Sequence, residues 1–84
     1  MKNGTNRYKF DKPAIYRISV QGILDEGWSS RLSGMQIIQN VNKKVTILCG
    51  YLPDQPALSG ILNSLYDLGL PILSVERLNE EVTA

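Results

Sequence analysis

The sequence contains no histidine and a single cysteine, Cys49. Without histidine, the usual general base is missing, and so are serine-histidine and cysteine-histidine nucleophile systems. Zinc sites need several cysteine or histidine ligands, which one cysteine cannot supply. Cys49 stands in the apolar run 45–49, so we expect a buried structural thiol. No dinucleotide-binding or P-loop glycine pattern occurs. The sequence therefore predicts no catalytic residue, no metal ligand and no cofactor.

The chain also has little net charge and no long apolar run. Nine basic and eight acidic side chains leave a net charge of +1 over 84 residues. Proteins that bind nucleic acid by neutralising phosphates normally carry a larger, clustered basic surplus. No stretch approaches the ~20 apolar residues of a membrane span, and the N-terminus is polar through Pro13 without a secretory signal. We therefore expect a cytoplasmic protein that contacts neither nucleic acid nor membrane.

The first half of the chain predicts a strand, a short helix and a hairpin. Apolar and polar residues alternate over 14–21, which indicates a strand with one apolar face. Asp25 is suited to cap a short helix over 25–32, although a loop is the alternative there. Two β-rich runs, 35–41 and 45–51, are separated by Asn42-Lys43-Lys44 and predict a hairpin.

A longer helix and a last strand complete the predicted elements. Asp54 precedes an apolar series with helical spacing that ends at Leu68, before Gly69 and Pro71. A strand follows over 72–78. The order of elements predicts an α+β fold with the ferredoxin-like β-α-β-β-α-β pattern and a four-stranded antiparallel sheet, its first helix short. The alternative is a four-stranded meander with one long helix.

The length predicts one domain. We expect it to span residues 14–78, between a flexible N-terminal segment 1–13 and a flexible C-terminal tail 79–84.

Several sequence motifs resemble those of a family of small uncharacterised bacterial proteins. The resemblance rests on Trp28-Ser29, Leu32-Ser33-Gly34-Met35, the run from Leu52-Pro53-Asp54-Gln55 to Ser59-Gly60, and Leu68-Gly69-Leu70-Pro71 continuing to Val75. It implies a bacterial cytoplasmic domain, and the family supplies no assigned activity. A second likeness is to acylphosphatases, through Val20-Gln21-Gly22 and Asn40. Their phosphate loop carries an arginine, whereas this chain continues to Asp25-Glu26, which argues against that activity.

The leading functional prediction is a non-enzymatic interaction or assembly module that forms a homodimer. One long and one short helix can cover only one face of a four-stranded sheet. The other face is then a mixture of apolar and polar groups, typical of a subunit interface. In this prediction Val45, Ile47 and Cys49 face the helices, as do Leu73 and Val75 in the last strand. The predicted interface residues on the other face are Ile15, Ile38, Leu48 and Ile72.

The alternative is a small-ligand-sensing regulatory domain. Its ligand would bind near the start of the longer helix, with Tyr51, Asp54 and Gln55 as candidate residues. We expect Asp54 to satisfy those helix amides itself, which favours a structural cap over a ligand site. An unusual enzyme using Tyr51 or Tyr66 is the third hypothesis.

Overall fold

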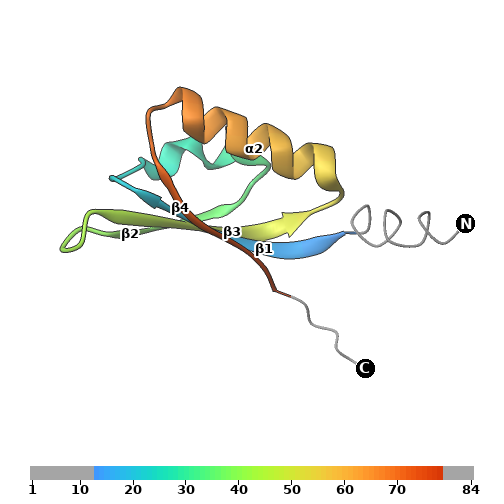
Figure 1. Cartoon of the computed structure of the whole chain (residues 1–84), viewed down its shortest axis with the longest axis horizontal. Coiled ribbons are helices and arrows are strands. Elements are labelled where there is room, and N and C mark those ends of the chain that lie inside the picture. Colours follow the sequence, from blue (N-terminus) through green and yellow to red (C-terminus); the bar gives the residue numbers. More distant parts are fainter. Residues whose placement is uncertain (1–12, 79–84) are drawn as a thin grey trace, which may run out of the picture.

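The computed structural model describes residues 13–78 as one layer of sheet covered on one side by two helices (Figure 1). The segment 1–12 and the predicted C-terminal tail 79–84 lie outside the described residues. The elements in chain order are β1 (Ala14–Gln21), η1 (Glu26–Leu32), β2 (Gln36–Asn40), β3 (Val45–Leu52), α2 (Gln55–Asp67) and β4 (Ile72–Leu78).

The four strands form a single antiparallel sheet in the order β2-β3-β1-β4. The predicted α+β class and four-stranded antiparallel sheet are therefore confirmed. The meander alternative is wrong, because β1 pairs with β3 and β4 and not with β2. The connection from β1 to β2 holds a 3-10 helix, whereas the regular ferredoxin-like pattern has an α-helix there.

The 3-10 helix η1 is short and is capped at both ends. Asp25 caps it, with Oδ2 accepting a hydrogen bond from the Gly27 amide at 2.9 Å. Ser33 ends it with a φ of 59°. Trp28 is half-buried and packs against the core, and the Arg31 guanidinium lies 5.3 Å from the centre of its ring. The short predicted helix is thus present in its tighter form.

Helix α2 begins and ends at the predicted signals. The Asp54 carboxylate accepts a hydrogen bond from the Ala57 amide at 2.9 Å, which identifies Asp54 as the N-cap. Ile61 and Leu65 are buried against the sheet. At the other end, Gly69 has a φ of 77° and the Leu70 amide donates to the Leu65 carbonyl at 3.1 Å. None of the helices in residues 13–78 combines the length and apolarity that a membrane crossing requires.

The core lies between the sheet and the two helices. Strand β1 contributes the most buried apolar side chains. Helix α2 lies against β3 and β4, and η1 lies against β2. The buried apolar side chains are Ala14, Tyr16, Ile18, Val20, Leu24, Leu32, Met35, Ile37, Leu48, Leu52, Ile61 and Leu65. The side of the sheet away from the helices is called the outer face below.

Candidate functional site

The outer face is set by the alternation of side chains along β1 and β3. Tyr16, Ile18 and Val20 are buried under the helices, so the intervening residues of β1 point the other way. Cross-strand register carries this assignment to the neighbouring strands, because directly opposite residues share a face. The outer face therefore consists of Ile15, Arg17, Ser19, Gln21, Gln36, Ile38, Asn40, Val45, Ile47, Cys49, Tyr51, Ser74, Glu76 and Leu78.

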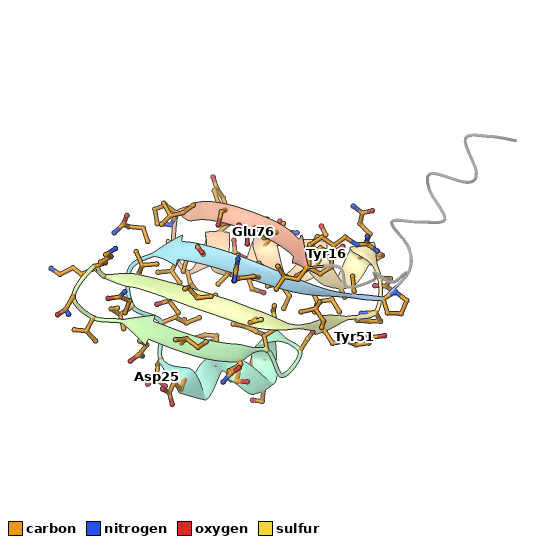
Figure 2. All side chains as sticks on the ribbon, turned by 90° about the horizontal axis from the view of Figure 1, so that it is seen from below. Tyr16, Asp25, Tyr51 and Glu76 are labelled. Carbon is orange, nitrogen blue, oxygen red and sulfur yellow. The ribbon has the colours of Figure 1, made fainter. Side chains whose placement is uncertain are left out.

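An apolar stripe follows the central strand β3 on this face. It consists of Val45, Ile47, Cys49 and Tyr51, which are half-buried except for Tyr51, 62% exposed. Residues on the neighbouring strands widen the stripe at two points. Ile38 of β2 lies opposite Ile47, and Ile15 of β1 lies opposite both Tyr51 and Leu78. Figure 2 views this face, and no helix crosses in front of the strands. The stripe with Ile15, Ile38 and Leu78 is called the outer patch.

Beside the outer patch lies one ion pair. The Arg17 guanidinium donates from Nε to Glu76 Oε1 at 2.9 Å, linking β1 to β4 across directly opposite positions. Both side chains are about half exposed, at 47% and 48%, so the pair contributes little to stability in water. The outer face is thus an apolar stripe with a charged pair along one flank.

Two predicted interface residues, Ile15 and Ile38, lie on the outer patch and are exposed. Leu48 does not, and this prediction is wrong. Leu48 is 0% exposed and lies opposite Ile18, which is also 0% exposed, so both point into the core. The error came from assigning Val45, Ile47 and Cys49 to the helix side. Both faces of β3 are largely apolar, so periodicity alone does not distinguish them.

Ile72 is exposed but does not extend the outer patch. It lies opposite Val20, whose side chain is in the core, across an irregularity in the pairing between Ser19 and Val20. The simple alternation expected for β4 fails at this point, because the irregularity shifts the register by one residue. From Ser74 onward the expected alternation holds.

The three candidate ligand residues are not brought together. Tyr51 is on the outer face, whereas Asp54 caps α2, which covers the opposite face. The Asp54 carboxylate already accepts the Ala57 amide, and Gln55 is exposed in the first turn of α2. These residues therefore do not form a common pocket.

A cavity lies at the other end of α2, where Tyr66, Gly69, Leu70 and Pro71 line about 280 Å³. Its walls are mainly apolar and Tyr66 is highly exposed, so no constellation of polar groups converges there. Within residues 13–78, no three metal-ligating side chains lie together.

The prediction from the sequence placed Ile47 and Val45 in the core and so missed them as surface residues. Cys49, expected to be buried, is half-buried on the outer face. Pairing Ile47 with the polar Ser19 is the signal that identifies this face.

Comparison with known domain families gives a match. No curated protein and no solved structure matches the chain. A domain family of unknown function, DUF8691, matches residues 15–76, which include the outer patch except Leu78 and nearly all of the sheet and helices. Because the match covers most of the sequence, this chain belongs to the DUF8691 family of domains of unknown function.

Proposed function

We propose that this chain is a non-enzymatic bacterial cytoplasmic module that assembles with itself through the outer patch. The observation that carries the proposal is the apolar stripe Val45, Ile47, Cys49 and Tyr51, which no described element covers. Burying apolar surface is the main driving force of association, at about 25 cal/mol per Å². A second copy could bury this surface about a two-fold axis, the commonest symmetry of soluble assemblies.

The composition of the outer face also suits an interface between copies. An apolar centre is flanked by polar groups such as Gln21, Asn40 and the Arg17–Glu76 pair. Interfaces commonly combine an apolar core with a polar rim. The small net charge of +1 also gives little electrostatic repulsion between identical chains.

We also infer that the fold is a reduced ferredoxin-like arrangement. The support is the strand order β2-β3-β1-β4 with every neighbouring pair antiparallel, and the position of α2 between β3 and β4. The reduction lies in the first crossover, where η1 replaces a full α-helix. The ligand-sensing alternative has less support, since Tyr51, Asp54 and Gln55 do not converge.

Self-association is tested by light scattering behind size-exclusion chromatography at micromolar concentration. We expect at least twice the 9.4 kDa mass of one chain. Ile38→Glu places a charge beside Ile47 at an exposed position, so it should halve the assembly mass while the fold remains intact. Asn63→Glu, on the exposed side of α2, is the matched control and should leave the mass unchanged.

Circular dichroism of each variant establishes that the chain still folds. A wild-type mass of 9.4 kDa would contradict self-association altogether. An assembly whose mass is unchanged by Ile38→Glu would contradict the outer patch as its interface.

A further inference from the structure

The two edges of the sheet differ in a way that singles out β4. The edge strand β2 has five residues, three of them Gln36, Gln39 and Asn40, and η1 packs against it (Figure 2). The other edge strand, β4, has seven residues, and no described element lies beyond it. An edge strand of this length is a template for pairing with another chain, because within residues 13–78 no strand pairs with its backbone N–H and C=O groups along one side.

Apolar side chains on β4 are left uncovered on the helix side. Val75 lies opposite the fully buried Ile18 and shares its face, yet Val75 is 42% exposed and Leu73 is 52% exposed. Tyr66 and Leu68, at the end of α2, are exposed as well. Helix α2 packs on β3 and β4 without closing over the side chains of this edge. The edge therefore carries apolar surface both on the strand and on the helix next to it.

We propose that β4 pairs antiparallel with β4 of a second copy of this chain, about a two-fold axis at Val75, joining two sheets of four strands into one of eight. Val75 is the middle residue of Ile72–Leu78, so this register gives every residue of the strand a partner. Ile72 then lies opposite the partner's Leu78, and Val75 lies opposite itself. Centring the axis on Glu76 would place two carboxylates directly opposite each other, which is destabilising.

Charge supports the same register. The last turn of α2 contains Asp67 and no basic residue, although helix C-termini favour cations. Helix α2 ends close to the beginning of its own β4 in the chain. In the antiparallel register, Arg77 of one copy lies opposite the partner's Leu73, on the side of the sheet that carries the partner's α2. Each Arg77 is thereby placed toward the negative end of the partner's α2.

The β4 pairing and the outer patch share Leu78 but otherwise use different residues, so the test separates them. All experiments on β4 use the Ile38→Glu background, in which the proposed contact through the outer patch is removed. If the outer patch is not an interface, the test of β4 is then unaffected. Light scattering should give twice 9.4 kDa in this background and 9.4 kDa after the further change Val75→Lys, which opposes two like charges at the axis.

Disulfide cross-linking tests the position of the axis. Directly opposite Cα atoms on antiparallel strands are about 4.5–5.5 Å apart, which suits a disulfide. With Cys49→Ser removing the native thiol, Val75→Cys should form a covalent dimer under mild oxidation. Val41→Cys, at a position 67% exposed in the hairpin turn, is the control and should cross-link at least about tenfold more slowly.

Two results would overturn the pairing. One is a folded Ile38→Glu protein with the mass of a single chain. The other is a Val75→Cys protein that cross-links no faster than Val41→Cys, because a cysteine at a two-fold axis must meet its own copy. A covalent dimer of the Val75→Cys protein, together with a single-chain mass after Val75→Lys, would support β4 as the interface and Val75 as the position of the axis.

Discussion

Thr46 is the buried polar side chain among residues 13–78, and it is 0% exposed. Its hydroxyl donates to the Gly22 carbonyl at 2.7 Å and accepts from the Leu24 amide at 3.0 Å. Gln39 adds a hydrogen bond from Nε2 to the Leu24 carbonyl at 2.9 Å. These three bonds satisfy backbone groups of the loop between β1 and η1. The same loop makes one backbone bond to the hairpin, from the Gly22 amide to the Lys44 carbonyl at 2.6 Å. A threonine inside an otherwise apolar run thus holds the chain where it leaves the sheet.

Thr46→Val tests this role, because valine keeps the shape and removes the hydroxyl. We expect a loss of about 2 kcal/mol in the free energy of unfolding, since a buried amide and a partly buried carbonyl lose a partner. Thr46→Ser keeps the hydroxyl and loses one methyl group, so it should cost about 1 kcal/mol. Urea unfolding measures both values. A valine variant as stable as the wild type would show that the hydroxyl does not stabilise the loop.

Among the elements, α2 depends on its ends as well as its packing. Only Ile61 and Leu65 are fully buried, while Leu58 and Leu62 are half-buried. A helix with such a narrow buried face gains less from tertiary contacts, so its capping interactions matter more to its stability. Asp54 satisfies the Ala57 amide at the N-terminus.

Substitution of Asp54 separates capping from any specific need for a carboxylate. Asp54→Ser retains a capping oxygen and should preserve most of the stability, whereas Asp54→Ala should cost about 1 kcal/mol. Chemical denaturation followed by circular dichroism provides the measurement. Equal losses in the two variants would contradict the capping role and would favour a function for the carboxylate itself.

For the whole molecule, self-association makes thermal stability depend on protein concentration. A partner that binds only the folded chain stabilises it by mass action. Over about a hundredfold increase in concentration, the Tm of the wild type should therefore rise by about 5 °C or more. The double variant Ile38→Glu/Val75→Lys alters both proposed surfaces, so its Tm should not change with concentration. Differential scanning calorimetry across a dilution series measures the effect, and a constant wild-type Tm would argue against assembly.

Most elements could be predicted from local patterns. The bounds of β1 and β4 agree with the prediction from alternation and flanking residues, and α2 agrees within about two residues of its capping signals. The short helix before β2 was also expected, but its 3-10 form was not. Gly27 and the neighbouring serines favour neither the α-helix nor the 3-10 helix strongly. In the structure, the 3-10 turn occurs together with the packing of Trp28 and Leu32 on the core.

The composition and periodicity of the chain determined the class of fold, the number of strands and the start and end of α2, because these depend on neighbouring residues. Which side chains of β3 point into the core and which point to the outer face was decided only in the tertiary structure. Its residues are apolar on both sides, so Leu48 and Ile47 are equivalent by pattern. Pairing with β1 places Leu48 against Ile18 in the core and Ile47 against Ser19 on the outer face. With this orientation the Thr46 hydroxyl forms hydrogen bonds with Gly22 and Leu24. If the side chains of β3 faced the other way, both hydrogen bonds would be lost.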